Sequence, residues 1–240
     1  MPLYARVEAV LASSIANGAL APGSRLPPED KLIERFGVSR TTIRAAVQNL
    51  AQRGLVEIQR GRGTFVTEPK ITQELTTLSG FVEDMEALGR QATARVLDQQ
   101  VVAANGPVAR QLALPRGTKV VRIQRVRLAD GVPLSFDETY LPRKLGERIM
   151  DEDLETEPIF SLLEKKYGTP LLEAEYRMEA VCADAVVARA LGIGVGGPIF
   201  LIERTSYSAA HRPVDYEKLH YRGDRIRFAT RLARRGAPRS

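Results

Sequence analysis

Apolar residues recur every three or four positions in the first part of the chain, which is the spacing of helices with one buried face. Three such helices are expected, at 3–17, 28–36 and 40–53. Ser39 precedes the third helix, where its hydroxyl can accept a hydrogen bond from a first-turn amide. A glycine-rich turn then separates two short strands, at 55–58 and 64–67. The order of these elements predicts a helix-turn-helix followed by a two-stranded wing.

The spacing changes further along the chain to an alternation of apolar and polar positions, which is typical of strands. A polar region at 70–77 is expected to be a linker, and a short helix is expected at 79–88. Strands are expected at 94–103, 120–128, 134–141, 171–181, 199–207 and 214–221. Helices are expected at 108–114, 145–150, 158–167 and 183–191. The sequence therefore predicts an α+β protein, with a winged helix-turn-helix at 1–69 and a second, compact domain at 78–240.

The third predicted helix has one apolar face and one polar face. Its apolar stripe consists of Ile43, Ala46, Val47, Leu50 and Ala51. The polar positions, which suit phosphate oxygens and base edges, are Arg40, Thr41, Thr42, Arg44 and Gln48. Arg60 and Arg62 would stand at the tip of the wing. A solvated amphipathic helix beside an ordinary hairpin is the alternative, but the order of the elements favours DNA binding.

The charge of the chain is unevenly distributed. The 240 residues have a net charge of +6, and residues 1–70 carry 10 Lys and Arg against 6 Asp and Glu. Residues 71–224 carry 19 against 23, whereas residues 225–240 carry 6 basic residues and no acidic one. A basic domain joined to an acidic one is expected of a DNA reader attached to a domain that does not bind DNA. The arginine-rich end is expected to be a frayed, solvated tail.

The first domain resembles the winged-helix domain of GntR-type bacterial transcription regulators. Four segments together carry this resemblance, at 2–4, 19–29, 36–44 and 61–66. The resemblance implies that operator DNA is contacted by Arg40, Thr41, Arg44, Arg62 and Gly63. The sequence departs from the family pattern at two positions. Pro28 stands where a small hydroxyl residue is usual, and Asp30 is acidic near a place where some members carry a base-contacting arginine.

Asp130 and Gly131 lie between two alternating segments, which is a strong signal for a two-residue hairpin loop. Counting outward from this loop gives the expected pairs: Arg127 with Leu134, Arg125 with Phe136, and Ile123 with Glu138. Arg125, Arg127 and Glu138 would then share an otherwise apolar face, where an unpaired charge is costly. We expect either an internal ion pair between Arg125 and Glu138, or a pocket in which the arginines bind an anionic group and Glu138 binds a hydroxyl or amine.

The second domain resembles the effector domain of the HutC subgroup of these regulators. The motifs that carry this resemblance lie at 81–85 with Gly89, and at 125–134, 138–142, 204–205, 213–214 and 221–225. This resemblance implies a six-stranded antiparallel sheet similar to that of chorismate lyase. It also implies an effector pocket lined by Phe81, Val82, Arg125, Arg127, Glu138, Ser161, Arg204 and Tyr221. Effectors in this subgroup include sugar phosphates and similar small polar metabolites. His211 stands where a glycine is usual in the last hairpin.

Other classes of protein fit the sequence less well. The single cysteine excludes an internal disulfide framework, and no segment is long and apolar enough to span a membrane, so a cytoplasmic protein is expected. An enzyme is the second hypothesis, but Cys182 is expected in the core, and His211 and His220 mark neither a metal site nor a triad. An architectural DNA-binding protein would leave the acidic domain unexplained. The sequence therefore predicts a homodimeric repressor without a cofactor, which binds palindromic half-sites of double-stranded operator DNA and responds to a small, anionic effector.

Overall fold

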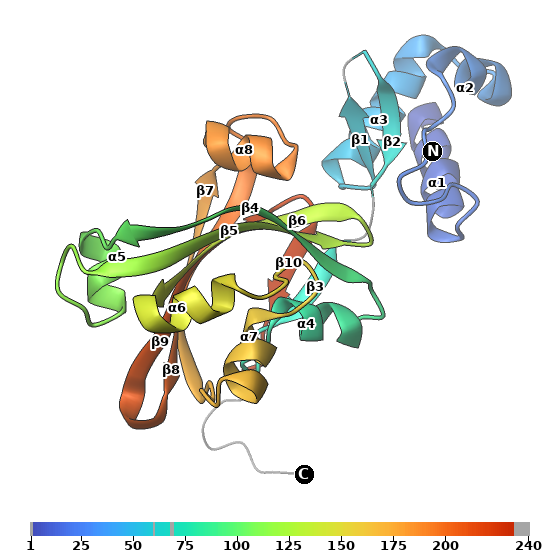
Figure 1. Ribbon diagram of the computed structural model, residues 1–240. Helices are drawn as coiled ribbons and strands as arrows, with labels where there is room; N and C mark the ends of the chain where they lie inside the picture. Colours follow the sequence, from blue (N-terminus) through green and yellow to red (C-terminus); the bar gives the residue numbers. More distant parts are fainter. Residues whose placement is uncertain (1, 60, 68–69, 233–240) are drawn as a thin grey trace, which may run out of the picture. The chain divides into compact units, whose positions relative to one another are not determined.

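The computed structural model describes residues 2–59, 61–67 and 70–232. The chain divides into two compact units, Met1–Pro69 and Lys70–Ser240 (Figure 1). Among the described residues, no helix combines the length and the apolar character needed to cross a lipid bilayer. Each unit has its own hydrophobic core, as is typical of separate domains.

Three helices and one hairpin form the first unit. They are α1 (Leu3–Ala16), α2 (Glu29–Phe36) and α3 (Arg40–Gln52), with β1 (Val56–Gln59) paired antiparallel to β2 (Gly63–Val66). Gly37 ends α2 with a φ of 63°, a left-handed conformation that turns the chain directly into α3. Ser39 caps α3, because its side chain accepts a hydrogen bond from the amide of Thr42. These elements confirm the predicted winged helix-turn-helix.

The predicted apolar stripe of α3 lies in the core of this unit. Ile43, Ala46 and Leu50 are fully buried, and they belong to one cluster with Val7 and Leu11 of α1. Burial of this stripe fixes the orientation of the helix. The polar side chains at the start of α3 are consequently left at the surface.

A six-stranded antiparallel sheet forms the centre of the second unit (Figure 1). Its strands are β4 (Ala92–Ala103), β5 (Lys119–Ala129), β6 (Val132–Pro142), β7 (Glu173–Cys182), β8 (Pro198–Ser208) and β9 (Arg212–Arg222). They lie in the order β4-β5-β6-β9-β8-β7, so β6 pairs with a strand far away in the sequence. All six strands that the alternating pattern predicts are present.

Helices cover both faces of this sheet. The face that carries Arg125, Arg127 and Arg204 is called the arginine face below. The elements packed on it are α4 (Phe81–Ala87), α6 (Arg143–Met150), α7 (Ile159–Ser161) and the π-helical turn η1 (Leu162–Lys166). The opposite face is covered by α5 (Gly106–Gln111) and α8 (Ala185–Leu191). The arginine face is therefore largely enclosed by helices.

A small second sheet joins the two ends of this unit, where β3 (Ile71–Glu74) pairs in parallel with β10 (Ile226–Ala229). Ile226 is fully buried, and the ring of Phe228 meets Phe200 and Tyr221 edge-on. These contacts hold both strands in the fold. β3 therefore lies where a linker was expected, at 70–77, and β10 lies where a frayed tail was expected, from residue 225 onward. The remainder of that tail, residues 233–240, lies outside the described residues.

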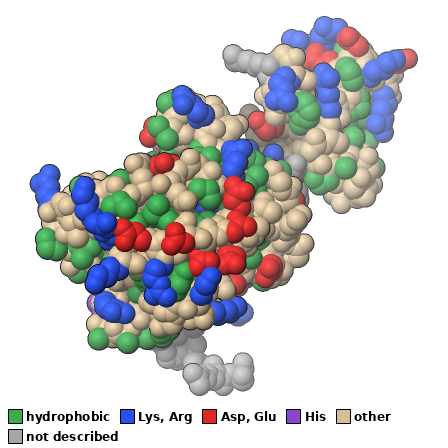
Figure 2. All heavy atoms as spheres, viewed as in Figure 1, with side chains coloured by type: hydrophobic (Ala, Val, Ile, Leu, Met, Phe, Trp, Pro, Cys, Tyr) green, Lys and Arg blue, Asp and Glu red, His purple; other side chains and the backbone are tan. Residues whose placement is uncertain are grey.

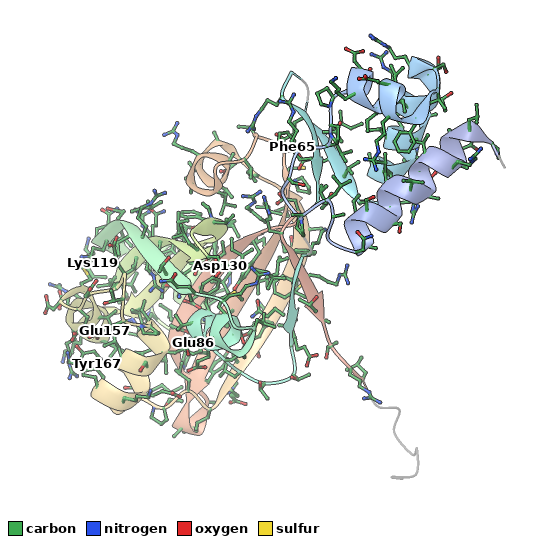
Figure 3. All side chains as sticks on the ribbon, turned by 90° about the vertical axis from the view of Figure 1, so that its right-hand side faces the viewer. Phe65, Glu86, Lys119, Asp130, Glu157 and Tyr167 are labelled. Carbon is green, nitrogen blue, oxygen red and sulfur yellow. The ribbon has the colours of Figure 1, made fainter. Side chains whose placement is uncertain are left out.

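The hairpin of β5 and β6 turns at Asp130 and Gly131, as predicted (Figure 3). A β-bulge then shifts the register by one residue, because Leu134 is an extra residue that is buried in the core. The observed pairs are Arg127 with Ser135, Arg125 with Asp137, Gln124 with Glu138, and Ile123 with Thr139. The three predicted pairs are therefore wrong. Since side chains alternate along a strand, Glu138 lies on the face opposite Arg125, and the expected ion pair between them does not form.

Candidate functional site

The start of α3 presents two exposed arginines that are paired with acidic residues of α2. Arg40 Nη2 lies 2.6 Å from Asp30 Oδ1, and Arg44 Nε lies 3.0 Å from Glu29 Oε1. Exposed ion pairs of this kind contribute little to stability, so they can exchange for other partners at small cost. They do hold both guanidinium groups at the surface of the first two turns of α3.

The two threonines of this first turn have different surroundings. Thr41 is exposed. Thr42 is half-buried, its amide donates to Ser39 Oγ at 3.2 Å, and the two hydroxyl oxygens are 2.8 Å apart. Thr42 therefore takes part in the cap of α3, whereas Thr41 has the more accessible hydroxyl group.

Gly63 begins the second strand of the wing in a position that only glycine fits. Its φ is 120°, and a Cβ atom there would lie 2.5 Å from Nε of Arg25. Arg62 beside it is exposed, with its guanidinium carbon 6.0 Å from the centre of the Phe65 ring. Arg60 lies outside the described residues. Figure 2 shows basic side chains at several places on the surface of this unit, with acidic side chains among them.

Buried charges gather on the arginine face of the second unit. They are Arg125, Arg127, Arg204, Asp137 and Glu217, with exposed fractions of 1%, 7%, 7%, 2% and 1%. Arg127 donates from Nε to Asp137 Oδ2 at 2.9 Å. Arg204 donates from Nη2 to Glu217 Oε2. Two of these three arginines thus have a buried carboxylate as a partner.

Arg125 is the third arginine, and its partners are incomplete. Its Nε and Nη2 atoms are buried and make no hydrogen bond to any residue that the structure describes. Burial, followed by the charge of Arg127, lowers the pKa of Arg125 to about 9, so the side chain remains positive at neutral pH. A buried charge without a partner is costly, and a bound anion would remove that cost. Arg125 therefore has the chemistry of an anion-binding residue.

Arg204 has partners on several sides. Its guanidinium carbon lies 4.4 Å from the ring centre of Phe160 in α7, and its Nη1 donates to Tyr176 Oη at 3.2 Å. Burial alone would raise the pKa of Glu217, but the charges of Arg204, Arg127 and Arg125 together outweigh burial and lower this pKa below its usual range. Thr139 also donates to Glu217, at 2.9 Å. Arg204 and Glu217 therefore connect α7, β6, β7 and β9.

Most of the other predicted effector residues surround this cluster. Phe81 begins α4 and places its ring centre 5.4 Å from the guanidinium carbon of Arg127. Tyr221 is buried on the arginine face, where burial raises the pKa of its hydroxyl group. Val82 of α4 and Ser161 of α7 are half-buried. The structure thus brings the arginines, Phe81 and Tyr221 together under two helices.

Asp137, rather than Glu138, supplies a carboxylate on the arginine face. Glu138 accepts a hydrogen bond from Gln124 at 2.8 Å on the opposite face. The bulge in the hairpin causes this exchange, and no residue pattern identifies the bulge in advance. Glu217 is absent from the predicted set, although it alternates with Tyr221 along β9 and this pattern could have placed it on the same face.

Asp215 of β9 is a further buried carboxyl group on this face. Burial, followed by the charge of Glu217, raises its pKa to about 7, and its Oδ2 atom has no partner among the described residues. The unfolded chain releases the same proton near an aspartate pKa of about 3.9. The contribution of Asp215 to stability is therefore complete below a pH of about 4 and is lost as the pH rises to about 7.

Asp215→Asn is expected to remove this pH-dependent loss. As the pH rises from about 5 to about 7, the unfolding free energy of the variant minus that of the wild type should increase by about 1–3 kcal/mol. Above a pH of about 8, this difference should change little. Urea denaturation of both proteins across this range measures the difference. A difference that is constant or shrinks with rising pH would show that Asp215 is ionised throughout.

The residues considered for catalysis do not form a site. Cys182 is exposed at the end of β7, not buried in the core as expected. His211 Nδ1 lies 2.6 Å from Glu173 Oε1, and His220 Nδ1 lies 3.1 Å from the carbonyl oxygen of Phe136. Over the described part of the chain, no three His, Cys, Asp or Glu residues come together in a group that could hold a metal ion.

The first unit is a winged helix-turn-helix with exposed arginines on its recognition helix. It is joined to a separate domain that has buried charges under its helices. This combination is that of a one-component transcription regulator, in which one chain binds both DNA and an effector. Residues 3–66 match the family described as bacterial regulatory proteins, gntR family, and residues 87–227 match the UTRA domain. The chain belongs to the GntR family of bacterial regulatory proteins, in its HutC subfamily.

Known relatives are similar over nearly their whole length. The transcriptional repressor NagR of Bacillus subtilis is 34% identical over 228 residues, which cover 95% of this chain and 93% of the relative. The histidine utilization repressor of Pseudomonas putida is 31% identical, with 97% and 93% covered. The crystal structure of PhnF from Mycobacterium smegmatis superposes with a TM-score of 0.66 at 28% identity, and 95% and 99% of the two chains are covered.

The chain is therefore a DNA-binding transcriptional repressor with a UTRA domain for a small-molecule effector. The predicted family and the predicted α+β fold are confirmed. The enzyme hypothesis is rejected, because the relatives are named as repressors and regulators and not as enzymes.

Proposed function

We propose that the protein is a homodimeric, cytoplasmic repressor whose binding to palindromic operator half-sites is modulated by a small, polar, anionic metabolite. The observation that carries the proposal is Arg125, a buried positive charge with two unpartnered nitrogen atoms. An anionic effector would supply the missing acceptors. Binding in the UTRA domain would then change how the two winged helices of a dimer are spaced.

The charge balance of the arginine face supports a single anionic group. Three buried arginines share two carboxylate partners, those of Asp137 and Glu217, while Asp215 is partly protonated at neutral pH. Because Arg127 and Arg204 already have carboxylate partners, the uncompensated charge is located at Arg125. An effector with one carboxylate or phosphate group would neutralise it, and a bidentate geometry would use both free nitrogens.

The residues around Arg125 suit the remainder of such a molecule. Phe81 and Val82 of α4 would cover it, while Tyr221 and Ser161 would offer hydroxyl groups. Relatives are named for histidine utilization and for fructoselysine utilization, and these names support a small polar metabolite as the effector. Glu138 is not part of this proposal, since it lies on the other face of the sheet.

The proposed DNA surface consists of the start of α3 and the wing. Arg40, Thr41, Thr42 and Arg44 would face the major groove, while Arg60, Arg62 and Gly63 of the wing would contact the backbone or the adjacent groove. In this surface Asp30 would keep Arg40 in place and would not itself contact a base. The ion pair of 2.6 Å between them supports that role.

Arg44→Ala is expected to weaken operator binding by about 1–3 kcal/mol if Arg44 reads a base edge. Arg35→Ala in α2 serves as the matched control, because Arg35 is also exposed but is not in α3. Fluorescence anisotropy with operator and unrelated DNA, at one salt concentration, measures both variants. An equal loss on both DNAs would make Arg44 a phosphate contact, and no loss would remove it from the surface.

The edge of the sheet supports a dimer. β7 is an edge strand with most of its residues exposed, and Tyr176 and Met178 on it are each 37% exposed. An edge strand of this kind can pair with a second copy of the chain, which would remove its free backbone groups from water. A symmetric dimer would place two winged helices on half-sites about one DNA turn apart.

The proposal is tested with the full chain and a DNA fragment from upstream of its own gene. We expect retardation of this fragment at low salt, two protected half-sites in a footprint, and a dimer in native mass spectrometry. Failure to retard any upstream fragment would contradict operator binding. A monomer that protects a single site would contradict the dimer alone.

A further inference from the structure

A groove lies at one end of the sheet in the second unit, away from Arg125. It is bordered by the end of α5, by α6 and by the beginning of β9, and it has a volume of about 650 Å³. Its lining residues are Leu112, Ala113, Leu114, Pro142, Lys144, Leu145, Arg148, Thr169, Arg212, Pro213 and Val214. Pro142 is five residues along β6 from Asp137, the partner of Arg125 in the sheet, or roughly 16 Å. The groove therefore shares no residue with the proposed effector site.

The floor of this groove is apolar. Leu112 and Val214 are buried beneath it, while Leu145 and Pro213 are half-buried at its walls. A volume of this size lies in the range of small-molecule sites, which are mostly lined by apolar side chains with a few polar groups. The floor would therefore favour a ligand with an apolar body.

The rim of the groove is basic. Lys144, Arg148 and Arg212 line it, and no aspartate or glutamate of the described chain does so. Arg148 stacks over the ring of Tyr167, with its guanidinium carbon 4.1 Å from the ring centre, and its charge is one of those that lower the pKa of nearby Glu152. Figure 2 shows basic side chains around the place where Figure 1 has α5 and α6, with acidic side chains among them over α6. An anionic group is what this rim would attract.

We propose that this groove is a second ligand site, which binds an organic anion with an apolar body, such as a medium-chain carboxylate. Inorganic phosphate would leave the apolar floor unused, and an uncharged apolar molecule would leave the three cations unused. The combination of floor and rim matches a molecule with both features. The inference is independent of the proposed effector site at Arg125.

The probe is 8-anilinonaphthalene-1-sulfonate, an apolar anion whose fluorescence rises on binding, with N-phenyl-1-naphthylamine as its uncharged counterpart. The wild-type protein is compared with Lys144→Gln/Arg212→Gln, since neither side chain supports a described contact of the fold. The matched control is Arg116→Gln/Lys119→Gln, which removes two exposed charges near α5 but outside the groove. Arg125→Met is included to separate this site from the effector site.

We expect about one sulfonate probe per chain, and about tenfold weaker binding in Lys144→Gln/Arg212→Gln. The Arg116→Gln/Lys119→Gln and Arg125→Met variants should bind it as the wild type does, and the uncharged probe should not distinguish the variants. Octanoate should displace the sulfonate probe, whereas octanamide should not.

Three results would overturn the inference. Unchanged binding of the sulfonate probe to Lys144→Gln/Arg212→Gln would show that the rim attracts no anion. Loss of binding in Arg125→Met would place the probe in the effector site. Displacement by a glutamate-rich peptide, but by no organic acid, would make the groove a docking site for an acidic protein segment.

Discussion

Arg125→Met is expected to abolish the response of the repressor to its effector while leaving operator binding intact. The variant removes both unpartnered nitrogens of a side chain that is 1% exposed, and each charge-assisted hydrogen bond that they would make is worth about 1.5–3 kcal/mol. Effector affinity should therefore fall by about 100-fold or more. Without effector, the variant should be at least as stable as the wild type, because a buried charge without a full set of partners is gone.

Arg122→Met is the matched control for this experiment. Arg122 lies on the same strand but on the opposite face, and its Nη2 is 2.8 Å from Asp98 Oδ2. This control should keep the effector response. Thermal denaturation with and without ligand measures both variants, and operator binding is followed by anisotropy. Unfolding of Arg125→Met in the absence of ligand would contradict an anion-binding role and would make Arg125 a structural residue.

Arg204→Met is expected to destabilise the second unit by about 3–5 kcal/mol, because it leaves Glu217 buried without its cation. Of the residues that the structure describes, Thr139 would remain as a hydrogen-bond donor to that carboxylate. The pKa of Glu217, which Arg204 now lowers, should rise in the variant. The wild-type contribution of Glu217 is present above its unfolded pKa and is lost as the pH falls through its lowered folded pKa. The deficit of the variant should therefore shrink on acidification.

The double variant Arg204→Met/Glu217→Met separates the charge from the packing. If the lost stability comes from an unpaired carboxylate, the double variant should recover most of it, since well-packed apolar residues often replace a buried pair without loss. Urea denaturation of the three proteins measures the effect. A double variant as unstable as Arg204→Met would instead assign the loss to the contacts of Arg204 with Phe160 and Tyr176.

Periodicity alone predicts much of this fold, because the core requires it. The stripe of α3 must face the core of the first unit, and the six long strands must bury alternate residues. The loop at Asp130 and Gly131 is also predictable, since few residue pairs suit a tight hairpin. The family resemblance adds the positions of Arg125, Arg127, Arg204 and Tyr221 on one face.

What the sequence does not predict depends on contacts between distant segments. The bulge opposite Arg127 arises because Leu134 enters the core, and it replaces Glu138 by Asp137 on the arginine face. The pairing of β3 with β10 joins residues more than 150 positions apart. The lack of hydrogen-bond acceptors for Arg125 is likewise not predictable, because it depends on the pairing of the nearby carboxylates with Arg127 and Arg204. These features are properties of the packed sheet and not of any local pattern.

The most direct test of the central claim is a thermal-shift screen of the wild-type protein and Arg125→Met with phosphorylated sugars, amino-acid derivatives and organic acids. A ligand that binds only the folded protein stabilises it by mass action, by about 2.7 kcal/mol at 100 times its dissociation constant. We predict that at least one anionic compound raises the melting temperature of the wild type and leaves that of Arg125→Met unchanged. A compound that stabilises both proteins equally, or a full panel that stabilises neither, would contradict the account.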